Sequence, residues 1–247
     1  MISIKIRGKA NLKGYTLLEG FPGAGLVGPM AISYIVEKLK MKYTGFIESD
    51  DFPPLIAIHG DMPMPPVRIY ADDKTKIVTI LAEFAIPIDV TYKLTDKIYE
   101  FVKANGIAKI ISIGGIPSPQ ASIESGNVFA IASNDAMKKE VQRAGLKPVG
   151  EGVATGVSAL MLINAVTEGL PDISVLVPVD PNILDPKYAE LAIKNVNKLV
   201  KLNVDVSELE EEAKEVESKI KDLLKRNKEV QDVHKKVIDE AGPSMYA

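Results

Sequence analysis

The 247-residue sequence contains neither cysteine nor tryptophan, and only two of its residues are histidine. Without cysteine the chain can form no disulfide, no thiolate metal site and no cysteine nucleophile. No apolar run reaches the roughly 20 residues that a membrane span needs, and the first residues lack a signal-peptide pattern. The motifs G-x-S-x-G and H-E-x-x-H and the phosphate-binding P-loop are also missing. We therefore expect a cytoplasmic protein with no membrane partner.

The charge of the chain is nearly balanced. It has 30 lysines and arginines and 33 aspartates and glutamates, which gives a formal net charge of −3. Such a balance argues against a general nucleic-acid partner. The hydrophobic fraction of 46% is ordinary for a globular core, and the length suits one α/β domain with an appendage.

Strand and helix patterns alternate over the first two hundred residues, which predicts a three-layer α/β/α sandwich on a mostly parallel sheet with an antiparallel portion. The order of strand, glycine turn, helix and strand near the start predicts a βαβ unit. Thr155–Glu168 is apolar on almost every side and predicts a buried helix. The predicted strands cover 2–6, 15–19, 43–48, 55–59, 67–70, 77–82, 108–113, 127–132 and 173–179, of which 108–113 and 173–179 are expected to be central, and the other predicted helices cover 29–40, 91–105, 134–144 and 186–202.

The sharpest local motif is Gly23-x-Gly25-x-x-Gly28, which follows a predicted strand and opens a predicted helix. Dinucleotide-binding loops have this arrangement, because glycines let backbone amides approach a pyrophosphate, and Glu48 stands twenty residues further on, where such a loop has its acid. The same glycines also suit a tight turn and close packing of helix on sheet. Prolines bracket the turn, and no lysine or arginine occurs from residue 14 to residue 37, so we favour the packing interpretation.

Two further glycine-bearing loops, Gly114–Gly126 and Gly150–Gly156, also follow predicted strands. In a parallel sheet the carboxyl ends of the strands share one edge, so these loops and the first can form one pocket there. Neither Ile110–Met137 nor Pro148–Pro186 contains lysine or arginine, which disfavours phosphoryl chemistry. We expect no cofactor, although these residues leave a metal-bridged site open.

Two aspartate pairs, Asp50-Asp51 and Asp72-Asp73, have the residue type of metal ligands, but such pairs are far more often turn residues. His59 stands alone on a predicted strand beside prolines and is interpreted as a structural residue. We predict no metal site from these residues.

The last forty residues combine a charged helix pattern with a narrow apolar seam. Hydrophobic residues recur every seven positions with a second position four residues after each, which is heptad spacing. Ser207 and Glu210 form a capping box at the start of the helix, and Gly242-Pro243 ends it. So polar a helix needs partners, from copies of itself or from the preceding helix folded back, unless it is a solvated amphipathic helix. The predicted oligomerisation residues are Leu209, Val216, Ile220, Leu223, Asn227, Val230 and Val237.

The sequence ends in Met245-Tyr246-Ala247, which is a hydrophobic residue, a tyrosine and any residue. An apolar side chain, a phenol and a terminal carboxylate can act together there, and a partner pocket with a lysine for the carboxylate can bind all three. We predict that these three residues bind a partner.

Four stretches of the chain are similar to motifs of a known family. They are the glycine segment 20–28, Gly114-Gly115, Gly152-x-x-Thr155-Gly156 and the segment 185–192. Together they resemble the proteasome-assembly-chaperone family in its archaeal branch, over about residues 10–202. The resemblance implies an α/β/α sandwich like that of nucleoside phosphorylases, without catalysis. Proteasome activators and assembly chaperones often end in hydrophobic-Tyr-any, which inserts between α-subunits of the core particle, and the last three residues match this motif one by one.

The expected organisation is an α/β platform over 1–204, a long helical arm over 205–241 and a flexible tail over 242–247. The resemblance implies a non-enzymatic homo-oligomer that docks its tail into the α-ring of the proteasome core particle, as an assembly chaperone or as an ATP-independent activator. The alternatives are a nucleotide- or nucleoside-binding enzyme that uses the glycine loops, and a scaffold whose coil binds another partner.

Overall fold

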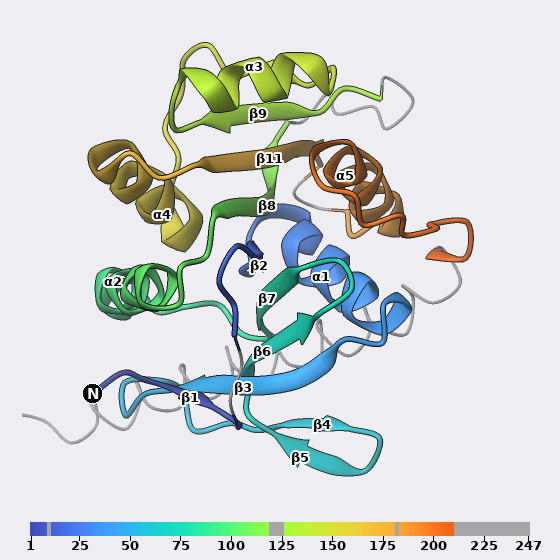
Figure 1. The fold of residues 1–247 in the computed structure, drawn as a ribbon. Helices are drawn as coiled ribbons and strands as arrows, with labels where there is room; N and C mark the ends of the chain where they lie inside the picture. Colours follow the sequence, from blue (N-terminus) through green and yellow to red (C-terminus); the bar gives the residue numbers. More distant parts are fainter. Residues whose placement is uncertain (9–10, 119–125, 181–182, 210–247) are drawn as a thin grey trace, which may run out of the picture.

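The computed structural model describes residues 1–8, 11–118, 126–180 and 183–209, which form a mixed α/β fold (Figure 1). Within these ranges a nine-stranded mixed sheet is combined with five α-helices, and none of the helices is long and apolar enough to cross a membrane. The strands are β1 (Ser3–Ile6), β2 (Thr16–Gly20), β3 (Lys42–Glu48), β4 (Ala57–His59), β5 (Met62–Met64), β6 (Val67–Asp72), β7 (Ile77–Ala82), β8 (Lys109–Pro117), β9 (Phe129–Ala132), β10 (Lys147–Pro148) and β11 (Asp172–Val179). The helices are a 3-10 turn (Ala24–Leu26), α1 (Val27–Lys38), α2 (Ile88–Ala104), α3 (Asp135–Arg143), α4 (Gly156–Glu168) and α5 (Pro186–Leu199).

The strand order in the large sheet is β1-β3-β6-β7-β2-β8-β11-β9-β10. Its centre is parallel, because β2 pairs in parallel with β7 and β8, and β8 pairs in parallel with β11. Antiparallel pairs join β1, β3, β6 and β7 on one flank and β11 to β9 on the other, where the outermost pair, β9 with β10, is parallel. β7 is buried along its whole length, as a strand with both faces covered should be. The predicted central strands, now β8 and β11, and the predicted antiparallel portion are confirmed.

Helices cover both faces of the sheet, with α1 and α5 on one face and α2 and α4 on the other (Figure 1). Each helix turns an apolar stripe toward the strands, as residues at i, i+3 and i+4 spacing allow. Ile32 of α1 and Ile193 of α5 are fully buried in one core cluster, and Leu94 of α2 and Met161 of α4 are fully buried in another. The enclosed strands therefore meet solvent and loops at their ends.

Three predictions about the strands are wrong in detail. The predicted βαβ unit does not form as a neighbouring pair, because β6 and β7 lie between β2 and β3. The predicted strand 55–59 is not part of the large sheet, since β4 pairs with β5 in a separate two-stranded hairpin. β8 continues into the predicted loop Gly114–Gly126, because its pairing with β11 extends to Pro117 opposite Val179.

The helix α4 is not the buried helix that its composition predicts. Met161 and Ala165 are fully buried, whereas Ile163 is 53% exposed and Val166 is 50% exposed. A helix in an outer layer has one side against the sheet and one side away from it, whatever its composition. The sequence pattern of α4 could not distinguish this outer position from a central one.

The segment after α5 packs onto the body of the protein rather than leaving it at once. The Tyr34 hydroxyl of α1 donates a hydrogen bond to the carbonyl of Asp205 at 3.0 Å, and Lys38 of α1 pairs with Glu208 at 2.7 Å. Leu209 is fully buried in the core between α1 and α5. Residues 205–209 thus lie against the body of the protein, and Leu209, which we predicted as a seam residue, is buried with the core of the described residues.

Candidate functional site

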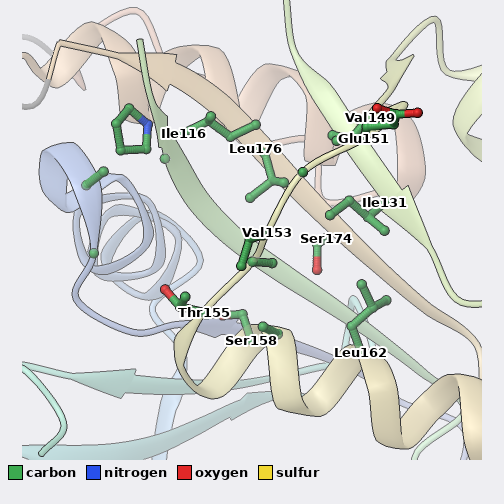
Figure 2. A pocket seen from close by; sticks show the side chains of 17 residues that line it. Ile116, Ile131, Val149, Glu151, Val153, Thr155, Ser158, Leu162, Ser174 and Leu176 are labelled. Carbon is green, nitrogen blue, oxygen red and sulfur yellow. The ribbon is translucent and has the colours of Figure 1, made fainter. Parts of the chain in front are cut away.

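A pocket lies at the carboxyl edge of the parallel strands (Figure 2). Gly23, Gly115 and Gly152 come from the three glycine-bearing segments, and all three line the same cavity of about 420 Å³. The predicted pocket from three glycine loops is therefore confirmed. Its volume lies in the range of small-molecule sites.

The wall of the pocket is mostly apolar. Ile131 of β9, Leu162 of α4 and Leu176 of β11 supply much of it, and Figure 2 shows their side chains around one space. Three hydroxyl groups interrupt this surface, those of Thr155 at the start of α4, Ser158 in its first turn and Ser174 in β11. The pocket therefore combines a small-molecule volume with few polar groups, which is the usual composition of a ligand site.

Two carboxyl groups are buried in the sheet beside the pocket. Glu19 of β2 pairs in register with Ser112 of β8, and Ser112 pairs with Ser174 of β11. These three residues therefore form one row across adjacent strands, and the row ends at the pocket. Glu19 and Asp172 are both 0% exposed, although acidic residues are almost never fully buried without a partner.

Burial raises the pKa of Glu19 to about 7, because the carboxylate loses its hydration. The hydroxyls of Ser112 and Ser158 and the amide of Phe21 lie close enough to favour the charged form, but they offset only part of this cost. Burial also raises the pKa of Asp172 well above its usual value, and the Glu19 carboxyl adds to that shift. Glu19 therefore holds a proton for part of the time near pH 7, where an exposed carboxyl would have released it.

The three glycines of the 23–28 motif have different roles. A Cβ on Gly28 would lie 2.5 Å from the carbonyl oxygen of Ile113, and a Cβ on Gly20 would lie 2.4 Å from the carbonyl oxygen of Gly28. Gly25 has a φ of +64°, in the left-handed region, and packs on Val179. Close helix–sheet packing therefore explains two of the three glycines, and Gly23 alone lines the pocket.

We expect Gly28→Ala to lower the free energy of unfolding by about 2 kcal/mol, because overpacking against backbone atoms outweighs the gain in helix propensity. The matched control is Gly23→Ala, where nothing lies within 4 Å of the added Cβ. Urea denaturation of both variants tests this expectation. Equal stability of the two variants would show that the contact between β2, α1 and β8 is not tight.

The acid that completes a dinucleotide-binding pattern is not near the glycine loop. Glu48 ends β3, which is separated from β2 by two strands. Its carboxylate accepts a hydrogen bond from the Ser3 hydroxyl at 2.9 Å and lies 3.4 Å from the Lys5 ammonium. Glu48 has the sequence spacing of the acid in a dinucleotide-binding loop. In the fold, however, it does not lie near the glycines.

The other candidate ligands have structural roles. Both aspartate pairs lie at turns, and Asp72 accepts hydrogen bonds from the amide and hydroxyl of Thr75 at 2.8 and 2.7 Å. His59 Nε2 lies 2.9 Å from Glu83 Oε1. In the part of the chain that the structure describes, no three His, Asp or Glu residues gather in a group that could hold a metal ion.

Sequence analysis did not single out Glu19, Asp172 or Ser174. The signal for them was an acidic or hydroxyl residue inside an otherwise apolar strand, as in Leu-Leu-Glu and Asp-Ile-Ser-Val-Leu. Such residues are costly in a covered strand unless they are paired or used. The alignment of Glu19 and Ser174 with Ser112 in one row depends on the strand order, which the sequence pattern did not predict.

The predicted partner-binding tail and most of the predicted seam lie outside the described residues. This applies to the tail residues Met245, Tyr246 and Ala247 and to the seam residues Val216, Ile220, Leu223, Asn227, Val230 and Val237. What the structure does describe is the attachment of the preceding segment, up to Leu209, on α1 and α5.

Comparison with known proteins places this fold in a family. The model of the PAC2 family matches residues 17–224. The uncharacterized protein MJ0106 of Methanocaldococcus jannaschii is 27% identical over 221 residues, which cover 90% of each chain. The crystal structure of Pyrococcus furiosus PbaA, an archaeal homolog of proteasome-assembly chaperone, matches with a TM-score of 0.83 and 25% identity over 95% of this chain and 100% of PbaA. Pyrococcus furiosus PbaB, an archaeal proteasome activator, matches with a TM-score of 0.72 and 23% identity over 90% of this chain and 98% of PbaB.

The family match spans well over half of the sequence, so this chain belongs to the PAC2 family. Among proteins of known structure it is similar to PbaA in both sequence and fold, and to PbaB in fold. The resemblance that the four sequence motifs indicate is confirmed.

Proposed function

We propose that this chain is a non-enzymatic proteasome-binding protein that acts as an assembly chaperone or as an ATP-independent activator. The main support is its similarity to PbaA, an archaeal homolog of proteasome-assembly chaperone, over 95% of the chain. PbaB, an archaeal proteasome activator, has the same fold. The fold is therefore compatible with either role.

The proposed contact is made by Met245, Tyr246 and Ala247, which dock into pockets of the α-ring of the core particle. The methionine side chain fills an apolar space, the phenol makes a hydrogen bond, and the carboxylate of Ala247 pairs with a lysine of the ring. A tail this short offers little contact area, so a single copy should bind weakly.

Several tails on one oligomer would compensate for that weakness. We propose that the seam from Val216 to Val237 joins copies of the chain and that the arm projects their tails together. Linking binding events in this way raises overall affinity by about 10²–10⁴ when the geometry permits simultaneous contact. The contacts of Tyr34 and Lys38 with residues 205 and 208 support a defined starting direction for each arm.

Deletion of residues 245–247 tests the docking mechanism. We expect this deletion to abolish co-purification with the cognate proteasome core particle, and Tyr246→Ala to weaken it at least tenfold, because each removes groups that enter the α-ring pocket. Addition of one glycine after Ala247 is the matched control, since it keeps all three side chains and only moves the carboxylate.

The circular dichroism spectrum and the mass in solution should be the same for all of these variants. Undiminished binding of the deletion variant would contradict the docking mechanism. Absence of binding by the intact chain would contradict the proposed function itself.

The alternative of a nucleotide-binding enzyme at the glycine motif has less support. Gly25 and Gly28 serve packing, and Glu48 lies two strands away from β2. No structural observation therefore favours a dinucleotide at this loop.

A further inference from the structure

We propose that the pocket lined by Gly23, Gly115 and Gly152 binds an uncharged small molecule that has an apolar ring and one hydrogen-bonding group. This proposal goes beyond proteasome binding and involves no residue of the arm or the tail. It rests on the shape of the pocket, on its buried hydroxyl groups and on its charge.

The volume and the apolar wall of the pocket can accommodate an apolar ring. The cavity of about 420 Å³ is enclosed by β9, β11 and α4, and its wall includes Ile131, Leu162 and Leu176 (Figure 2). Burial of an apolar ring against such side chains is favourable in proportion to the area removed from water. The loop with Val153, which is 95% exposed, runs over the same space and leaves it accessible.

Two polar groups of the pocket lack hydrogen-bond partners among the described residues. Ser174 is only 4% exposed and lines the cavity, and no hydrogen bond from its hydroxyl to another described residue is formed. Thr155, at the start of α4, also lines the cavity and makes no side-chain cap, so amides of the first helical turn are free there. A hydroxyl that faces the cavity without a protein partner is available to a ligand with a hydrogen-bonding group.

The charge of the pocket excludes an anion. Among the described residues that line it, Glu151 is the charged one. The sequence has no lysine or arginine in 14–37, 110–137 or 148–186, which include all three loops. An anion would therefore have helix and loop amides but no cation, and the Glu151 carboxylate would repel it.

A cation is also disfavoured, although an acid is near. The Glu19 carboxyl is fully buried, stands next to the Ser158 hydroxyl and holds a proton for part of the time near pH 7. It therefore offers no fixed negative charge inside the cavity, and the Glu151 carboxylate is exposed at the rim, so neither acid repays the desolvation of a cation. An uncharged molecule avoids both costs.

Three isosteric probes test the assignment, namely benzamide, benzoate and benzamidine, which are neutral, anionic and cationic forms of one shape. In equilibrium dialysis of the full chain at neutral pH, we expect benzamide to bind saturably at millimolar concentration, as is usual for a molecule this small. Benzoate should bind at least tenfold more weakly, and benzamidine no more tightly than benzamide. Equal binding of benzoate, tighter binding of benzamidine, or no saturable binding of benzamide would overturn the proposal.

Two variants of α4 locate the binding. Ala159 lines the pocket, so we expect Ala159→Phe to fill it and weaken benzamide at least tenfold. Ile163 lies on the exposed side of the same helix, and Ile163→Phe should leave binding within twofold. Unchanged binding to a folded Ala159→Phe variant would place the ligand elsewhere and overturn the proposal.

Ser174→Ala keeps the test decisive if Ala159→Phe does not fold. We expect it to weaken benzamide about threefold or more, because the Ser174 hydroxyl supplies the hydrogen bond, and unchanged binding would overturn the proposal. Deletion of residues 245–247 should not alter benzamide binding, so failure of this proposal and failure of tail docking can be told apart.

Discussion

Arg68→Met is expected to lower the free energy of unfolding by about 3–5 kcal/mol, because it leaves the Glu83 carboxylate buried without its guanidinium partner. Arg68 is 1% exposed and Glu83 is 2% exposed. Arg68 binds Glu83 through two hydrogen bonds, of 2.5 Å from Nη2 and 3.1 Å from Nη1. Arg68 Nη1 also donates to the carbonyl of Pro65 at 3.1 Å. The same pair therefore holds the segment that follows the β4–β5 hairpin, and guanidinium chloride denaturation measures the loss.

The double variant Arg68→Met/Glu83→Leu separates the cost of an unpaired charge from the value of the pair. Replacement of both partners by apolar residues is often neutral or stabilising, so most of the lost stability should return. The matched surface control is Lys97→Met, which removes the exposed pair with Glu100 and should cost within about 0.5 kcal/mol. A single variant as stable as the wild type would show that water reaches Glu83.

The pair also predicts how stability responds to acid. Burial alone would raise the pKa of Glu83, but hydrogen bonds from His59 and Arg68 outweigh it and lower the pKa below 4.5. A lowered pKa in the folded state means that the pair contributes its full stability above pH 4.5 and loses it as the pH falls through the folded value. The double variant should lack this loss.

Glu19→Gln is expected to change how stability depends on pH. The sign of the effect is opposite to that of the Arg68–Glu83 pair. The pKa of Glu19 rises from 4.5 to about 7 on folding, so its contribution is fully present below pH 4.5 and is lost as the pH rises through about 7. The wild type therefore bears a cost of about 3 kcal/mol at pH 8 that glutamine does not, since one unit of pKa corresponds to about 1.4 kcal/mol. Glutamine keeps the shape of the side chain and its unpaired polar atoms. The change in the stability difference between pH 5 and pH 8 therefore isolates the effect of the charge.

Denaturation of wild type and Glu19→Gln at pH 5 and pH 8 measures this difference. We expect the variant to gain about 2–3 kcal/mol relative to wild type between the two conditions, in line with the shift of the pKa. Glu151→Gln on the pocket rim is the control and should show no such gain. A pH-independent difference for Glu19→Gln would mean that the carboxyl is hydrated and that the row from Glu19 to Ser174 is open to water.

The two buried acids also bear on the pocket. A carboxyl that holds its proton near neutral pH can donate as well as accept a hydrogen bond. Glu19 lies close to Ser158, which lines the cavity, but both of its carboxyl oxygens lack a hydrogen-bond partner among the described residues. The pH series above tests the charge of this carboxyl without any ligand.

The sequence by itself determined the local elements and the loops, because these depend on patterns a few residues long. Apolar periodicity located β2, β7, α2 and α5 within a few residues. Glycine segments after apolar strands predicted one pocket, since the ends of parallel strands must share an edge, and Gly23, Gly115 and Gly152 do meet there. The motifs at residues 20–28 and 185–192 indicated the family that the comparison then showed.

Only the tertiary structure decided which strands are neighbours. β2 lies beside β8, about ninety residues later in the chain, and β3 lies at a distance from β2 although it follows directly after α1. That order removes Glu48 from the glycine loop and places Glu19, Ser112 and Ser174 in one row. It also exposes one side of α4 and buries Leu209. Periodicity shows which side of an element is apolar, but the partner of that side is set by contacts between residues far apart in the chain.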